Sequence, residues 1–114
     1  MLNYIFVPVT GNIELKEFNP SITEMFNIAA KEVGGIHTDF TCFDQPPFVI
    51  IADDGDVTDL KENIRINNFT NRGKFFGDCI IIKASPDYKS RSDYSGMACM
   101  SKEEINYITN MLEN

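Results

Sequence analysis

The sequence predicts a single α+β domain over residues 1–114, with a mostly antiparallel sheet of five to six strands and two helices in the rough order ββα, βββ, β, α. Three observations lead to this fold class. An apolar run at 79–84 has the pattern of a strand buried on both faces, two capping boxes precede apolar stripes with helical spacing, and the strand signals cluster together. Because strands and helices do not alternate strictly, α+β is favoured over a doubly wound parallel sheet.

The run from Gly77 to Pro86 is the element around which the rest is organised. It contains three consecutive isoleucines between Cys79 and Lys83, and it does not alternate between apolar and polar residues. A half-exposed strand would alternate, so this pattern indicates a strand covered on both faces. Isoleucine is stiff at χ1 and fits a pleated strand better than a helix.

The first half of the chain predicts a β-hairpin over residues 4–18, followed by a helix over residues 21–33. Ser21 and Glu24 have the spacing of a capping box, and the apolar residues that follow form one helical stripe. Two further strands are expected at 36–43 and 48–52.

The second half begins with an acidic turn, in which Asp54 and Gly55 give the strongest hairpin signal, and a short return strand is expected at 57–60. Residues 61–74 are predicted to form an irregular polar excursion with one helical turn, and residues 85–100 to form a mobile loop. Ser101 and Glu104 make the second capping box, and they predict a closing helix that packs Ile105, Ile108 and Leu112, with Tyr107 and Met111, on the sheet.

Composition and charge exclude several classes of function. The formal charge of −7 at pH 7 opposes direct binding to nucleic acid, because the phosphate backbone is also negative. No apolar run approaches the roughly 20 residues that cross a bilayer, and the first residues lack the pattern of a signal peptide. Three widely spaced cysteines are typical of reduced thiols, so we expect a cytoplasmic protein that does not bind membranes.

Metal binding and nucleophilic catalysis are both disfavoured by spacing. The acidic group Asp53, Asp54, Asp56, Asp59 and Glu62 departs from the EF-hand pattern, so a solvated turn is preferred to a metal site. His37 and Cys42 have opposite parity along a strand, which places them on opposite faces. No motif indicates a reaction or a cofactor, and we expect a protein that is not an enzyme.

Two segments remain as candidate binding sites. The excursion holds basic and amide side chains that could contact a small anionic ligand or a nucleotide: Arg65, Asn67, Asn68, Arg72 and Lys74. Exposed charges of this kind are more often simply solvated. In the loop, Tyr88, Arg91 and Tyr94 are residue types that anchor protein interfaces.

Several features occur together along the chain: the N-terminal hairpin and helix, the strand and acidic turn at 48–55, the segment 67–72, the strand at 77–82 and the helix start at 100–105. This arrangement resembles a family of small uncharacterised domains encoded by phages, plasmids and other mobile elements. The resemblance brings no catalytic residues. It implies a setting in which small acidic proteins inhibit host defence systems.

The leading hypothesis is therefore a non-enzymatic binding protein that engages a host or phage protein, for example a basic nucleic-acid-binding protein. Its contacts would come from the acidic residues Asp53, Asp54, Asp56 and Asp59 together with the loop residues Tyr88, Arg91 and Tyr94. The alternative is a small-ligand or nucleotide-binding module that uses the segment from Arg65 to Lys74.

Overall fold

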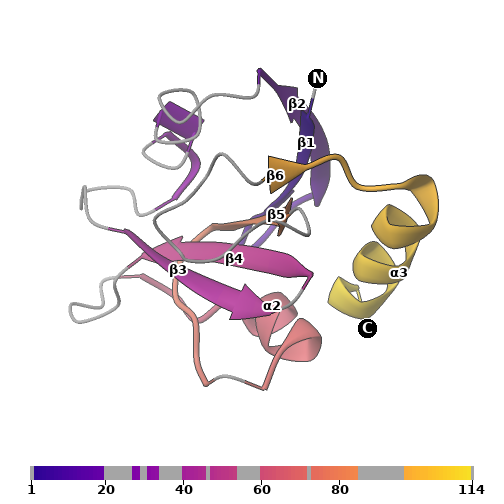
Figure 1. The fold of residues 1–114 in the computed structure, drawn as a ribbon. Helices are drawn as coiled ribbons and strands as arrows, with labels where there is room; N and C mark the ends of the chain where they lie inside the picture. Colours follow the sequence, from indigo (N-terminus) through magenta and orange to yellow (C-terminus); the bar gives the residue numbers. More distant parts are fainter. Residues whose placement is uncertain are drawn as a thin grey trace.

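The fold is an antiparallel sheet with helices packed on it, which confirms the predicted α+β class (Figure 1). The computed structural model describes residues 2–19, 27–28, 31–33, 40–45, 47–53, 60–71, 73–84 and 97–113. The elements in chain order are β1 (Leu2–Val7), β2 (Glu14–Phe18), β3 (Phe40–Gln45), β4 (Phe48–Asp53), α2 (Ile64–Phe69), β5 (Cys79–Ala84), β6 (Met97–Ala98) and α3 (Lys102–Leu112).

Strand β5 lies at the centre of the sheet, as its sequence predicts. The strand order is β2-β1-β5-β4-β3, and β6 pairs with the end of β5. All the pairings are antiparallel, with Ile81 of β5 opposite Ile5 of β1 on one side and opposite Ile50 of β4 on the other. The isoleucines of β5 are at most 2% exposed, because both faces of the strand are covered.

The two faces of the sheet carry separate apolar cores. On one face, Ile5, Ile50 and Ile81 pack with residues of α2 and α3, including Ile66 and Ile108. On the other face, the alternate residues of the same strands pack with Ile28 and Val33. Successive side chains of a strand point to opposite faces, so a strand buried on both sides needs an unbroken apolar run.

The helix predictions agree with the structure where residues are described. Residues 27–28 and 31–32 are helical, whereas Val33, the last residue of the predicted helix at 21–33, is not in a helix. The other residues of that predicted helix lie outside the described residues. Ser101 caps α3: its hydroxyl accepts from the Glu104 N–H, while the Glu104 carboxylate accepts from the Ser101 N–H. The predicted packing of Tyr107 on the sheet is wrong, because its side chain is 59% exposed.

The excursion between β4 and β5 contains α2, a helix of six residues, where one helical turn is expected. The predicted turn at 54–55 and all of the return strand except Leu60 fall outside the described residues, and Leu60 is not in a strand. Gly77 ends the excursion with a φ of +78°, and its N–H donates to the Lys61 carbonyl at 2.8 Å. A Cβ at this position would lie 2.9 Å from Leu60 Cδ1, so glycine allows both the backbone conformation and the close approach.

Candidate functional site

The candidate ligand segment is held in place by Asn63, which is fully buried. The Asn63 side-chain amide donates to the carbonyl oxygens of Val7 at 2.9 Å and Gly77 at 3.0 Å. Its side-chain oxygen accepts from the Ile66 N–H at 3.3 Å and so caps α2. The Asn63 side chain therefore connects three parts of the fold: the end of β1 at Val7, the end of the excursion at Gly77 and the first turn of α2. A buried amide with these bonds is structural, because its donors and its acceptor are already used.

The predicted cations of this segment make contacts within the protein. Arg65 donates through Nη1 to the Pro8 carbonyl at 3.0 Å. The Lys74 ammonium lies 4.0 Å from the Glu62 carboxylate, and its side chain is 72% exposed. Arg72 lies outside the described residues. Arg65 and Lys74 are thus each placed beside an oxygen of the protein itself.

The two asparagines of the candidate ligand site differ in exposure. Asn68 is exposed, whereas Asn67 is half-buried and donates to Glu62 Oε2 at 2.7 Å. The Asn67 side-chain oxygen is buried and has no hydrogen-bond partner. It could accept one hydrogen bond, but a single amide oxygen on a half-buried side chain does not define a ligand pocket.

The residues predicted to contact a protein partner are mostly outside the described part of the chain. Only Asp53 is described, and at the end of β4 it is buried, with 7% of its area exposed. The structure thus does not place the Asp53 carboxylate on the surface. Asp54, Asp56 and Asp59 of the acidic turn, and Tyr88, Arg91 and Tyr94 of the loop, lie outside the described residues.

The two described free cysteines, Cys79 and Cys99, differ in burial. Cys79 is fully buried, and burial, with a smaller contribution from Asp78, raises the pKa of its thiol to about 12. A thiol with so high a pKa holds almost no thiolate at neutral pH and is a poor nucleophile. Cys99 is exposed. His37 and the side chain of Cys42 lie outside the described residues.

Metal-binding side chains do not cluster in the part of the chain that is described. Among those residues, no group of three or more His, Cys, Asp or Glu side chains could hold a metal ion. Only Asp53 and Glu62 of the acidic group considered as a metal site are described. The Glu62 carboxylate accepts a hydrogen bond from the Asn67 side-chain amide.

Sequence reasoning missed one surface residue, Tyr107. It lies on α3 next to the fully buried Ile108, and its ring is largely in water. Large exposed aromatic side chains are enriched among the residues that dominate protein interfaces. A helical wheel could have found it, since Tyr107 lies about 100° around the helix from Ile108.

Comparison of the chain with protein-family models, with curated proteins and with solved structures gave no match. Across the described residues, no helix is long and apolar enough to cross a membrane. The assignment of a function therefore depends on the charge, the burial and the contacts described above.

Proposed function

We propose that this protein is a non-enzymatic binding protein that engages another protein through an acidic surface. The observation that carries the proposal is the distribution of charge. The chain has 17 acidic and 10 basic residues, and several described basic side chains are engaged by partners within the fold.

Three lysines form ion pairs with carboxylates, and one arginine donates a hydrogen bond to the backbone. Lys16 lies 2.8 Å from Glu32, Lys83 lies 2.9 Å from Glu104, and Lys74 lies 4.0 Å from Glu62. Arg65 donates to a backbone carbonyl. Each of these three lysines is paired with a carboxylate, and the chain as a whole still carries seven excess negative charges.

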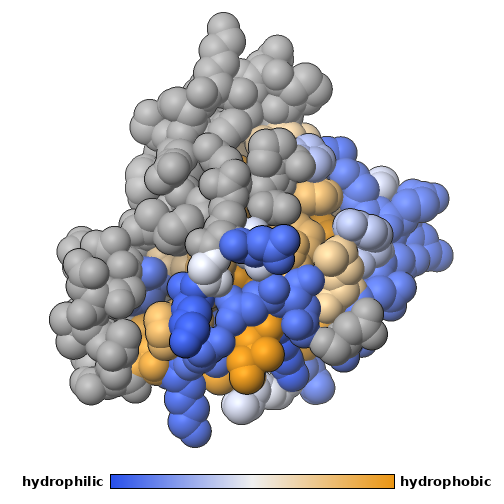
Figure 2. Space-filling model, turned by 90° about the horizontal axis from the view of Figure 1, so that it is seen from below, coloured by the Kyte–Doolittle hydropathy of each residue, from blue (hydrophilic) through white to orange (hydrophobic). Residues whose placement is uncertain are grey.

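The described surface also suits polar recognition. Figure 2 views the molecule from the side on which α2 lies in Figure 1, and hydrophilic residues there surround smaller apolar patches. Large hydrophobic side chains at the described surface include Leu15, Ile64 and Tyr107, on three different elements. Scattered single hydrophobic side chains are normal on a protein surface. The proposal therefore depends on charge, since complementary potentials raise the rate at which two proteins meet.

The contacts of the proposed surface are the acidic turn, with Asp54, Asp56 and Asp59, and the loop residues Tyr88, Arg91 and Tyr94. The partner is a basic protein of a host or phage, such as a nucleic-acid-binding protein. The resemblance to domains of mobile elements supports this choice, and it gives the protein a role against host defences. We leave Asp53 out of the contact set because it is buried.

The geometry favours this function over the binding of a small anion by the segment from Arg65 to Lys74. Arg65 donates to Pro8, and Lys74 lies near Glu62, so both cations have a competing partner in the fold. A ligand anion would have to displace those contacts or share them.

The test is affinity capture from the native host, with parallel washes at low salt and at about 0.5 M salt, which strongly screens surface charges. We expect a basic protein that is retained at low salt and lost at high salt. Capture of the same proteins at both salt concentrations, or of no protein at either, would contradict an acidic binding surface.

A further inference from the structure

Strand β2 forms one edge of the sheet. It pairs with β1 on its inner side, and among the residues that the structure describes no strand pairs with its outer side. Three of its five residues are exposed, namely Glu14, Leu15 and Glu17. The outer side of an edge strand carries backbone N–H and C=O groups that can pair with another chain. Leu15 is 52% exposed, so this edge also offers an apolar contact.

A pocket of about 310 Å³ adjoins this edge. Strands β1 and β2 line one side of it and helical residues line the other: Tyr4, Lys16 and Glu17 against Asn27, Ile28 and Lys31. Lys16 and Glu17 are consecutive, so their side chains point to opposite faces of the sheet. A pocket that is lined by both residues therefore reaches the backbone at the edge of β2.

The floor of the pocket is apolar and fixed. Tyr4 and Ile28 are only 5% and 8% exposed, and both belong to the core on this face of the sheet. Tyr4 also packs edge-on against Phe18, with ring centroids 5.7 Å apart. The volume is at the lower end of the range of roughly 300–1,000 Å³ that is usual for small-molecule sites. A pocket of this size can take one apolar side chain of a partner.

Lys16 belongs to a polar network within the fold. Its ammonium lies 2.8 Å from Glu32 Oε2 and 3.6 Å from Glu14 Oε2, and the Tyr4 hydroxyl donates to Glu32 at 3.4 Å. The charge of Lys16 is thus already neutralised by carboxylates. The exposed charges that remain among the lining residues are Glu17 on the strand side and Lys31 on the helix side.

These two charges select different side chains on the two faces of an added strand. Leu15 and Glu17 are two residues apart, so they share the face opposite to that of Lys16. There a lysine or arginine of a partner can lay its aliphatic stem along Leu15 and place its charge at Glu17. On the pocket face, Lys31 repels a basic side chain, whereas Tyr4 and Ile28 accept an apolar one.

We propose that an extended basic segment of a partner protein adds to β2 as a further strand. One of its apolar side chains enters the pocket at Tyr4 and Ile28, and a neighbouring lysine or arginine lies on the other face at Leu15 and Glu17. In this mode of binding, backbone hydrogen bonds supply the affinity and alternate side chains the specificity. The formal charge of −7 favours a basic segment over an acidic one. This surface shares no residue with the acidic turn or the loop proposed above, so either can fail without the other.

The test is a titration of the ¹⁵N-labelled protein with a seven-residue peptide, acetylated and amidated at its ends, in which lysines alternate with valine, phenylalanine and valine. We expect saturable shifts of the backbone amides at Tyr4, Lys16, Glu17 and Ile28. A peptide of the same composition with its apolar residues in one block should bind at least about tenfold more weakly, because it cannot separate the two kinds of side chain onto two faces. Shifts that do not saturate, or equal binding of the two peptides, would overturn the proposal.

Methylation of the peptide backbone distinguishes strand addition from simple attraction of charges. Successive N–H groups of a strand point to opposite sides, so only one alternate set can face β2. We therefore compare the peptide N-methylated at its lysines with the peptide N-methylated at its apolar residues. One of them should lose binding and the other should retain it. Loss in neither peptide would contradict pairing with the edge of β2.

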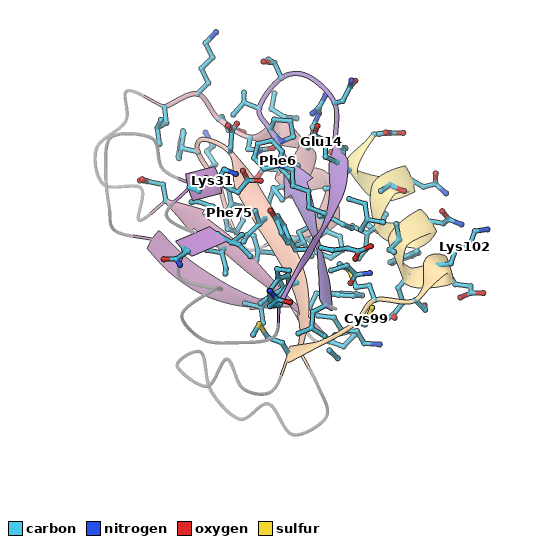
Figure 3. All side chains as sticks on the ribbon, turned by 90° about the horizontal axis from the view of Figure 1, so that it is seen from above. Phe6, Glu14, Lys31, Phe75, Cys99 and Lys102 are labelled. Carbon is cyan, nitrogen blue, oxygen red and sulfur yellow. The ribbon has the colours of Figure 1, made fainter. Side chains whose placement is uncertain are left out.

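A charge reversal in the protein makes the test specific to this edge. Glu17→Lys should weaken binding of the alternating peptide about tenfold, because it replaces an attraction by a repulsion. Glu103→Lys is the matched control: Glu103 is exposed and adjoins Lys102 of α3, which lies on the opposite side of the molecule from Lys31 (Figure 3). Both variants change the formal charge from −7 to −5. Equal weakening by the two variants would show that only the net charge matters and would overturn the proposal.

Discussion

Asn3 and Met100 exchange two hydrogen bonds, although they are 97 residues apart in the chain. The Asn3 side-chain amide donates to the Met100 carbonyl at 3.2 Å, and the Met100 N–H donates to the Asn3 side-chain oxygen at 2.8 Å. The side chain of Asn3 thus pairs with the backbone just after β6 as a neighbouring strand would. It joins β1 to the segment that leads into α3.

Replacement of Asn3 by alanine should therefore destabilise the fold. Both partner groups on Met100 are buried, and they would lose their hydrogen bonds without access to water. We expect the free energy of unfolding to fall by about 1–3 kcal/mol, measured by urea denaturation. Asn19→Ala is the control at an exposed asparagine and should change stability by less than about 0.5 kcal/mol. Equal effects of the two variants would contradict the role of Asn3.

Asn63 should be the most sensitive polar position of the excursion. Asn63→Ala removes the cap of α2 and leaves the Val7 and Gly77 carbonyls without their donor, at a cost of about 2–4 kcal/mol. Asn63→Asp keeps the capping oxygen but places a carboxylate against two carbonyls, so it should be equally destabilising at neutral pH.

The control for the Asn63 variants is Arg65→Ala, which removes the hydrogen bond that the half-buried Arg65 side chain donates to the Pro8 carbonyl. Its cost should be about 1 kcal/mol or less, measured by the same denaturation. A larger loss of stability in Arg65→Ala than in Asn63→Ala would refute the assignment of Asn63 as the residue that holds this segment.

The ion pair between Lys83 and Glu104 should make stability depend on pH in the acid range. The hydrogen bond from Lys83, together with those from Ser101, holds the pKa of Glu104 below its ordinary value of 4.5. A carboxyl group with a lowered pKa stabilises the fold above its ordinary pKa, and that stabilisation is lost as the pH falls through the lowered value.

Glu104→Gln keeps a side chain that can complete the capping box and removes the charge. It should cost about 1 kcal/mol or less at pH 7, and the difference from the parent protein should shrink toward about pH 3. Urea denaturation across this pH range measures the difference, with Glu103→Gln as a control for the loss of one charge in the same helical turn. A difference that stays constant with pH would show that the ion pair does not stabilise the fold.

The neighbouring residues Tyr107 and Ile108 should respond in opposite ways to truncation. Ile108 is fully buried against the sheet, so Ile108→Ala should cost about 2–5 kcal/mol of stability. Tyr107 is 59% exposed, and Tyr107→Ala should change the free energy of unfolding by about 0.5 kcal/mol or less. Thermal or urea denaturation would show the contrast, and a large destabilisation by Tyr107→Ala would contradict the exposed position of its ring.

The fold class could be predicted because its main signals are local. The apolar run of β5 and the capping box of α3 each lie within ten residues or fewer, and both are confirmed. The bonds of Asn63 could not be predicted. Its partners Val7 and Gly77 lie 56 and 14 residues away, and an asparagine in a polar segment is ordinarily expected in a solvated loop.

The hydrogen-bond partner of Arg65 in the candidate ligand segment could not be predicted from the sequence either. A sequence shows that Arg65 carries a charge, but the direction of its side chain depends on where the Pro8 carbonyl lies after folding. The pocket beside Tyr4 was also missed. Its lining is Tyr4, Lys16, Glu17, Asn27, Ile28 and Lys31, and no short segment of sequence contains that combination.

The most direct test of the acidic binding surface compares three proteins in the capture experiment at low salt. They are the parent protein, Asp54→Asn/Asp56→Asn/Asp59→Asn, and the control Glu14→Gln/Glu103→Gln/Glu113→Gln, which removes the same number of charges from other positions and likewise changes the formal charge from −7 to −4. We predict that the control retains the partner and that the triple aspartate variant loses it. Equal retention by both variants would contradict the central claim that the acidic turn forms the binding surface.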